Sequence, residues 1–265
     1  MGCLIVGVLN VTPDSFSDGG RFGSVEAAIE AGVAMAREGA DWIDVGGEST
    51  RPGAVPVAED DERARVVPVI AGLKARLPTG VRISIDTYKA GTARAALGAG
   101  ATVVNDISGG LLEPGILGAA AEADAAVVLG HLRGAPATMM EGISFSDVVV
   151  EVGDELAARV AAARAAGCRE VWADPGIGFG KRLEHNLALL RALPALAGRV
   201  GAPLMVGVSR KAFIGHLTGK PPGERQFGTA AAVTAAILGG AAAVRVHDVG
   251  PARDVRAVAD PLVHD

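Results

Sequence analysis

The chain alternates eight short apolar runs with longer segments of helical periodicity, and this alternation limits its possible folds more than any other feature. Runs this short are typical of strands buried on both faces of a parallel sheet. The runs cover residues 4–10, 42–45, 82–86, 102–106, 126–131, 171–174, 204–209 and 244–247, and helical patterns cover residues 25–37, 59–76, 91–97 and 145–166. Eight strand–helix units in 265 residues, without a linker, predict one α/β domain over residues 1–265. A closed (β/α)₈ or TIM barrel is favoured over an open doubly wound sheet.

Each apolar run ends in polar or charged residues of the kinds that bind ligands. In chain order these are Asn10, Asp44 with Glu48, Asp86, Asn105 with Asp106, His131, Asp174, Ser209 with Lys211, and Arg245 with His247. Asp and Asn also start turns and cap helices, and this simpler interpretation suits Asp106 and can apply to Asp44. It does not explain eight polar strand ends that include Arg, Lys and His. Because the C-terminal ends of all barrel strands surround one mouth, we expect the active site there.

Composition excludes several classes of function. Only 3% of the residues are aromatic, so the core must be built from Val, Ile, Leu and Ala, which suits buried parallel strands. A net charge of −5 argues against general binding to nucleic acid or to an anionic membrane. An anionic ligand must then be held by a few placed cations. Among the scarce lysines, we attribute Lys74 and Lys89 to base composition rather than to a site.

Features that would indicate export or membrane insertion are weak. We interpret Cys3 and Cys168 as packing residues, which only weakly indicates a reducing compartment. The N-terminus lacks the basic start and the cleavage site of a signal peptide. The uncharged residues 227–244 are long enough to span a membrane, but they are rich in Ala, Gly and Thr, so we expect a buried helix followed by a buried strand. We predict a soluble, cytoplasmic protein with no membrane or nucleic-acid partner.

Seven motifs resemble those of the dihydropteroate synthase family, in the family's order. They are NVTPDSFSDGG (residues 10–20), GGESTRPGA (46–54), SIDT (84–87), NDISGG (105–110), DPGIGFGK (174–181), SRK (209–211) and RVHDV (245–249). One short motif would be weak support, whereas seven in order across essentially the whole chain are specific. Leu132 and Ala212 stand where the family more often has Met and Ser, a departure that concerns local substrate packing rather than the reaction.

The resemblance implies a reaction and a set of site residues. The family joins 6-hydroxymethyl-7,8-dihydropterin pyrophosphate to the amine of p-aminobenzoate, releases pyrophosphate with the help of Mg²⁺, and is usually homodimeric. Carried over by motif, the pterin residues are Asp86, Asn105, Asp174 and Lys211, the pyrophosphate residues are Thr50, Arg245 and His247, the p-aminobenzoate residues are Thr50, Arg51 and Lys211, and the metal ligand is Asn10. The catalytic residues would be Asp86, Lys211 and Asn10. His131 would at most support the pocket wall.

The residue types suit these ligands on chemical grounds. The carboxylate of Asp174 can accept from the ring N–H and the exocyclic NH₂ of a pterin at once, and Asn105 can both donate and accept. Arg245 and His247 alternate along the last strand, point the same way and together suit a diphosphate. Mg²⁺ commonly takes substrate phosphates with one or two protein oxygens, so Asn10 is sufficient and a preformed cage is not required.

The expected mechanism needs little acid or base catalysis. In the family's reaction, pyrophosphate departs dissociatively and the arylamine captures a pterin-stabilised cation, whose positive charge the carboxylate of Asp86 would stabilise. We find no Ser/His or Cys/His pair and no sign of a covalent intermediate. The Gly- and Pro-rich segments 46–56 and 13–20 suit loops that close on a bound substrate.

Two other functions stay open at this point. A barrel that passes a folate methyl group to a corrinoid protein would keep the pterin carboxylates, but it needs neither the Arg245–His247 pair nor Thr50 and Arg51. A catalytically silent barrel that binds pterin or a partner protein is also compatible with the sequence, although no expected catalytic position is lost.

Overall fold

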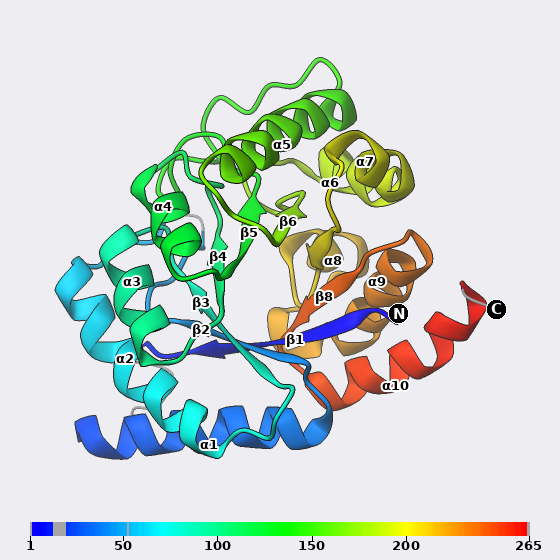
Figure 1. Cartoon of the computed structure of the whole chain (residues 1–265). Coiled ribbons are helices and arrows are strands. Elements are labelled where there is room, and N and C mark those ends of the chain that lie inside the picture. Colours follow the sequence, from blue (N-terminus) through cyan, green and yellow to red (C-terminus); the bar gives the residue numbers. More distant parts are fainter. Residues whose placement is uncertain (1, 13–19, 52, 264–265) are drawn as a thin grey trace.

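Eight parallel strands form one sheet that curves into a nearly closed barrel (Figure 1). The structure, a computed structural model, describes residues 2–12, 20–51 and 53–263. The strands are β1 (Leu4–Asn10), β2 (Trp42–Gly46), β3 (Arg82–Asp86), β4 (Val103–Asp106), β5 (Ala126–Gly130), β6 (Val171–Asp174), β7 (Met205–Gly207) and β8 (Ala243–Val246). Their order is β6-β5-β4-β3-β2-β1-β8-β7, and a parallel bridge between Ala173 and Leu204 brings the two edge strands together. The predicted barrel is confirmed, with strand limits shifted by one or two residues at most.

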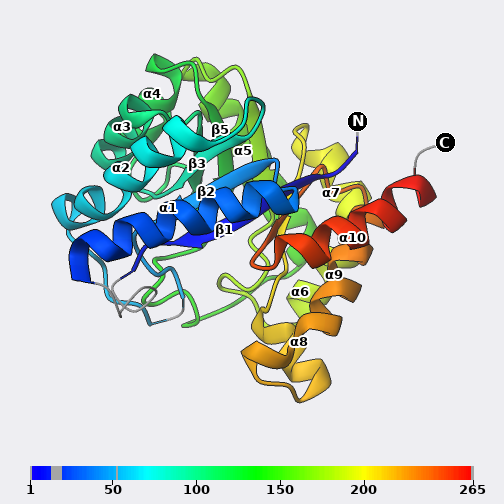
Figure 2. The same cartoon turned by 90° about the horizontal axis from the view of Figure 1, so that it is seen from below.

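The helices surround the barrel, as Figures 1 and 2 show. They are α1 (Gly20–Glu38), α2 (Glu59–Arg76), α3 (Ala90–Ala99), α4 (Gly115–Glu122), α5 (Val148–Ala165), α6 (Leu183–Arg191), α7 (Leu193–Val200), α8 (Ala212–Thr218), α9 (Gln226–Leu238) and α10 (Val249–Ala259). Helix α5 begins later than the pattern predicts because Asp147 caps it, accepting from the backbone N–H of Val149 at 3.0 Å and of Val150 at 3.1 Å.

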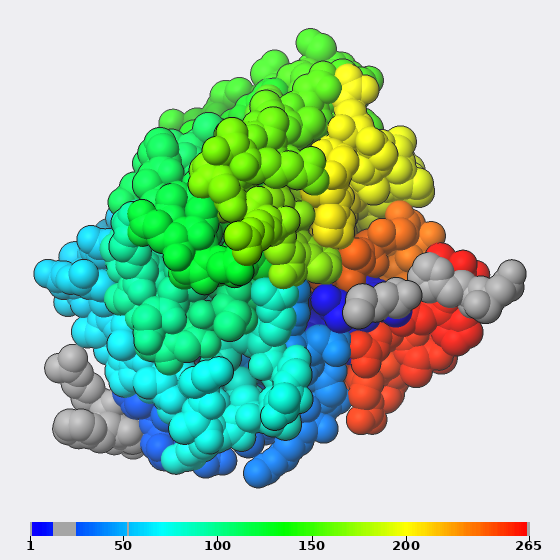
Figure 3. All heavy atoms as spheres, viewed as in Figure 1, coloured from blue at the N-terminus to red at the C-terminus, as the bar shows by residue number. Residues whose placement is uncertain are grey.

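The uncharged residues 227–244 form nearly all of helix α9 and the first residues of β8, as predicted. Within the part of the chain that the structure describes, none of the helices combines the length and the hydropathy that a membrane span requires. The N- and C-terminal elements lie side by side, and Figure 3 shows residues near the N-terminus in blue beside α10 in red. There the backbone N–H of Cys3 donates to the carboxylate of Asp260 at 3.2 Å.

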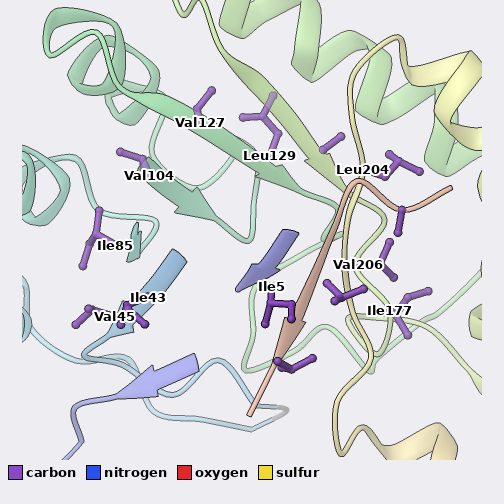
Figure 4. Close-up of a cluster of buried hydrophobic side chains, with 14 of the residues drawn as sticks. Ile5, Ile43, Val45, Ile85, Val104, Val127, Leu129, Ile177, Leu204 and Val206 are labelled. Atoms are coloured by element: carbon purple, nitrogen blue, oxygen red, sulfur yellow. The ribbon is translucent and has the colours of Figure 1, made fainter. Parts of the chain in front are cut away.

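Alternation along each strand separates an apolar base of the barrel from a polar mouth. Outward side chains, such as Ile43 and Val45 of β2, pack beneath the helices in the cluster that Figure 4 draws. At the base of the interior, Trp42 and Trp172 meet edge to face, with ring centroids 5.1 Å apart. Asp44 shares the face of Trp42 two residues further along β2, because side chains alternate with period two. The strands therefore fill one end of the barrel with apolar groups and direct polar groups to the other.

Candidate active site

A hollow of about 400 Å³ lies at the C-terminal ends of the strands, where the sequence predicts the active site. Its lining residues are Thr50, Asp86, Asn105, Ile107, Gly130, Asp174, Gly176, Phe179, Gly207, Lys211 and Arg245. Six predicted site residues are among them, so strands far apart in the sequence do converge here. The predicted residues Asn10, Arg51 and His247 do not line the hollow.

Arg245 joins two buried carboxylates across the barrel mouth. Its Nε donates to Asp44 Oδ2 and its Nη2 donates to Asp86 Oδ2, both at 2.6 Å. Asn105 Nδ2 also donates to Asp44 Oδ2, at 3.0 Å. The interpretation of Asp44 as a simple turn residue is therefore wrong, since it anchors the floor of the hollow. For Asp106 the simpler interpretation is confirmed, because its carboxylate accepts from the backbone of the following turn.

One oxygen of each carboxylate in this group is left free to accept. Asp44 Oδ1 and Asp86 Oδ1 are buried and have no hydrogen-bond partner among the described residues. Burial raises the pKa of Asp86 to about 7, against the opposing effect of the Arg245 charge. A buried acceptor without a donor is unfavourable, so a ligand N–H placed at Asp86 Oδ1 would be favoured.

Asp174 and Lys211 face each other on the opposite side of the hollow. Asp174 Oδ1 accepts from the backbone N–H of Gly176 at 2.7 Å, and burial raises the pKa of this carboxyl against the effect of Lys211. Lys211 donates to the backbone carbonyl of Ile177, and burial lowers its pKa to about 8. A Cβ on Gly207 would lie 3.4 Å from Lys211 Nζ and 3.9 Å from Asp174 Oδ2. Glycine at 207 therefore keeps the space between the two charges open.

His247 lies one residue beyond β8, where positive charges gather. Its Nδ1 lies 3.0 Å from Ser209 Oγ. Burial lowers its pKa to about 4, with further lowering by the charges of Arg245, Arg210 and Arg51. The imidazole is therefore neutral at pH 7, and one of these three guanidinium groups, Arg210, is paired with Asp248. Arg245 itself is turned toward the two carboxylates, so its predicted contact with pyrophosphate stays a prediction.

The comparisons with known proteins agree with this geometry. Residues 6–247 match the family described as pterin binding enzyme. The chain belongs to this family. It is 48% identical to a dihydropteroate synthase of Synechocystis over 97% of this chain and 89% of that protein, and 45% identical to that of Mycobacterium leprae over 98% and 93%.

Solved structures of similar proteins share the fold. The dihydropteroate synthase of Xanthomonas albilineans with 4-aminobenzoic acid gives a TM-score of 0.91 at 43% identity, covering 100% of this chain and 94% of that one. Its complex with 7,8-dihydropteroate gives a TM-score of 0.88 at 41% identity, covering 100% and 95%.

In this pterin-binding enzyme the predicted loop residues occupy the rim. Asn10 ends β1, pairs with Gly46 of β2 and is half-buried. Thr50 is half-buried, whereas Arg51 is exposed. Most of the predicted loop at residues 13–20 lies outside the described residues. Among those that are described, no three His, Cys, Asp or Glu side chains gather as a metal cage. The side-chain oxygen of Asn10 is a donor of the kind that Mg²⁺ takes, and magnesium binding stays a prediction.

Sequence reasoning missed two buried networks of the pterin-binding enzyme. In the first, Lys181 Nζ lies 2.9 Å from His131 Nδ1, and His131 Nε2 lies 3.0 Å from Glu155 Oε2. Because the ionised carboxylate of Glu155 only accepts, His131 Nε2 carries the proton and His131 Nδ1 accepts from Lys181. Burial lowers the pKa of His131 to about 4, which keeps the ring neutral. His131 therefore supports the loop behind the hollow rather than the ligand.

The second network contains Lys89, which the sequence analysis attributes to base composition. Lys89 is buried and forms ion pairs with Glu48 and Glu62. Base composition alone therefore does not account for Lys89. The sequence places Glu48 inside the motif GGESTRPGA and Lys89 two residues after SIDT, but neither motif shows that the two side chains meet. The departures Leu132 and Ala212 lie outside the lining of the hollow.

Proposed function

We propose that this chain is a dihydropteroate synthase that condenses 6-hydroxymethyl-7,8-dihydropterin pyrophosphate with p-aminobenzoate, giving 7,8-dihydropteroate and pyrophosphate. The observation that carries the proposal is the convergence of two acidic groups and two cations on one hollow at the strand ends: Asp86 with Arg245, and Asp174 with Lys211. Relatives that match over most of their length carry this name. A homodimer in the cytoplasm is part of the proposal.

The floor of the hollow supplies the groups that a pterin requires. Asp174 would accept from the ring N–H and the exocyclic NH₂, because a carboxylate matches this pair of donors. Asp86 Oδ1 would accept a further ring N–H, and the side-chain amide of Asn105 would read another ring edge. Lys211, still largely protonated near neutral pH, would donate to the ring carbonyl. The aromatic ring of Phe179, 4.7 Å from Lys211 Nζ, adds an apolar wall.

The diphosphate would lie toward His247, where the charges of Arg245, Arg210 and Arg51 meet. Asn10 would hold Mg²⁺ together with the phosphates, and the bound cation would neutralise charge on the departing pyrophosphate. Thr50 would face the phosphates and the second substrate. Arg51 would pair with the carboxylate of p-aminobenzoate, since a guanidinium suits that planar anion.

In the reaction, the bond between the pterin methylene carbon and the diphosphate oxygen breaks, and its electron pair leaves on pyrophosphate. The amine lone pair of p-aminobenzoate forms the new C–N bond, and the surplus proton on nitrogen passes to solvent. Asp86 would stabilise the positive charge on the pterin between these steps, because a fixed carboxylate in a partly dry site acts strongly. Lys211 would fix the ring relative to the incoming amine.

The test is release of pyrophosphate, measured with both substrates together and with each alone. A synthase releases pyrophosphate only when p-aminobenzoate is present and forms dihydropteroate in equal amount. A methyl-transfer barrel or a silent pterin-binding protein would bind the pterin and release none. Transfer of a methyl group from a methylated folate to a corrinoid separates these last two.

A further inference from the structure

A buried charged cluster lies beside the hollow without lining it. Lys89 Nζ pairs with Glu48 and donates to Glu62 Oε2 at 2.8 Å, and Thr92 Oγ1 donates to the same oxygen at 3.1 Å. Lys89 is 9% exposed, Glu48 is 8% exposed and Glu62 is 1% exposed. The predicted reaction uses none of these residues. Removing two carboxylates and one ammonium group from water costs free energy, so we expect this cluster to have a specific role in the structure.

Glu48 closes the base of the loop that carries Thr50 and Arg51. Its Oε1 accepts from Tyr88 Oη at 2.8 Å, and its Oε2 accepts from Lys89 Nζ and from the backbone N–H of Val57 at 3.1 Å. One carboxylate therefore joins the first part of the loop to its last part. Because three donors hold its carboxylate, the side chain of Glu48 is fixed in one position.

The residue before Glu48 is fixed from the other side. A Cβ on Gly47 would lie 2.8 Å from Val66 Cγ1 and 3.3 Å from the backbone oxygen of Glu62, so only glycine lets the loop pass this close to α2. Arg65 Nη1 donates to the Gly47 carbonyl at 2.8 Å. Helix α2 thus holds the loop at residue 47, and the cluster holds it at residue 48.

Lys89 also connects the loop to the floor of the hollow. It lies three residues after Asp86, at the N-terminal cap of α3, and its backbone N–H donates to Thr87 Oγ1 at 3.2 Å. The backbone N–H of Thr87 in turn donates to the carbonyl of Asn105 at 3.0 Å. A displacement of the loop base relative to Asp86 would break these buried contacts.

We propose that Lys89 is a positioning residue for the second substrate, because through Glu48 it sets where Thr50 and Arg51 stand relative to Asp86. The identity of that substrate rests on the proposed function. Apolar residues of similar volume often stabilise a protein interior as much as a buried ion pair does. We therefore attribute this cluster to the fixed geometry that it gives the loop. Lys89 does not line the hollow, so we expect it to act through the loop rather than by contact with a substrate.

The test compares Lys89→Met with Arg94→Met on the outer face of the same helix. Among the described residues Arg94 forms an exposed ion pair with Glu122 and no contact with the loop, so we expect its loss to leave the loop in place. In Lys89→Met we expect the KM for p-aminobenzoate to rise roughly ten- to hundredfold, since small misplacements of positioning groups have effects of this size. The dissociation constant of the pterin should stay within about twofold of the parent. Lys89→Arg should restore part of the loss.

Hydrogen exchange provides a readout that does not depend on the reaction. The amide of Val57, which donates to Glu48, should exchange about tenfold faster in Lys89→Met than in Arg94→Met. Tyr88→Phe removes one donor to Glu48, leaves the ion pairs intact, and should produce smaller changes of the same kind. If Lys89→Met does not fold, Tyr88→Phe decides the question.

Three outcomes overturn the proposal: an unchanged KM for p-aminobenzoate, an equal loss for both substrates, or unchanged exchange at Val57. If the parent forms no dihydropteroate, the proposed function fails, while the exchange experiment still decides whether Lys89 and Glu48 fix the loop.

Discussion

The floor and the rim of the hollow are built in different ways. The floor residues are Asp44, Asp86, Asn105, Asp174, Lys211 and Arg245, which stand on or directly after strands and contact one another or the backbone. The rim residues are Asn10, Thr50 and Arg51, which are half-buried or exposed. The floor is thus formed before a ligand arrives. The rim loop is held at its base by Glu48, and beyond the base the described backbone contacts are those of Gly53 N–H with the Pro136 carbonyl and of Ala54 N–H with the Arg51 carbonyl. We therefore expect the pterin site to be preformed, and the p-aminobenzoate site to be completed only when the pterin pyrophosphate has bound.

The largest effect should follow from removing the cation of the floor. Arg245→Met leaves Asp44 and Asp86 buried without their partner, and breaking a buried pair in this way lowers the free energy of unfolding by about 3–5 kcal/mol. The loss should be smaller at acid pH. A carboxyl whose pKa is raised in the folded state binds protons more tightly there than when unfolded, so stability rises as the pH falls from about 7 toward 4. Urea unfolding at several pH values measures both effects.

Parent-like stability in Arg245→Met would show that the floor does not depend on this ion pair. The predicted contact of Arg245 with the diphosphate is tested separately, by measuring ligand affinity on the folded fraction of Arg245→Met. The pyrophosphorylated substrate should lose more affinity than a pterin without phosphates. Equal losses would assign Arg245 to the pterin pocket alone.

The next effect is ordered binding at the rim. If the competent state of the loop is populated at roughly 1%, p-aminobenzoate binds about a hundredfold more weakly than to the closed site. Pyrophosphate with Mg²⁺ would give the loop an anion and a metal to close upon. Calorimetric titration of p-aminobenzoate with and without these two ligands measures the difference. Matching affinities would mean that the rim is as preformed as the floor.

The floor could be predicted from the sequence more completely than the networks behind it. Parallel strands bring their C-terminal ends together whatever the loops do, so a polar residue after each apolar run was enough to place Asp86 and Asp174. Lys89, by contrast, meets Glu48 and Glu62 from sequence positions 41 and 27 residues away. These contacts depend on how two helices pack, and no periodicity in one segment reports that.

The role of Asp44 could not be predicted from the sequence for a related reason. As an aspartate near the end of a strand it resembles a turn residue, and only the curvature of the sheet brings it to Arg245, 201 residues away. The rim loop at residues 46–56 could be located from its Gly and Pro content, but its fixed base could not.

A third prediction examines how finely the floor matches the pterin. Asp174→Asn keeps the size of the side chain but places an NH₂ where the ligand also donates. An unmatched buried donor of this kind weakens pterin binding by about 1–3 kcal/mol. Folding should be preserved, because the remaining oxygen can still accept from Gly176. Pterin affinity by calorimetry, with unfolding as the control, gives the result. Parent-like affinity would remove Asp174 from the pterin site.

The smallest effect is a difference in pH dependence between the two substrates. Burial lowers the pKa of Lys211 to about 8, so its donor charge is lost as the pH rises through that value. The kcat/KM for the pterin pyrophosphate should then fall about tenfold by one pH unit above it, as expected for a single required proton. Lys211→Arg keeps its charge, so the part of the fall due to Lys211 should disappear in this variant, whereas titration of the substrate itself remains in both proteins. The described rim residues Asn10, Thr50 and Arg51 include no lysine of this kind. If Lys211 contacts the pterin alone, the KM for p-aminobenzoate should stay level between pH 7 and 9. A parallel alkaline loss for both substrates that disappears in Lys211→Arg would instead support the predicted contact of Lys211 with p-aminobenzoate.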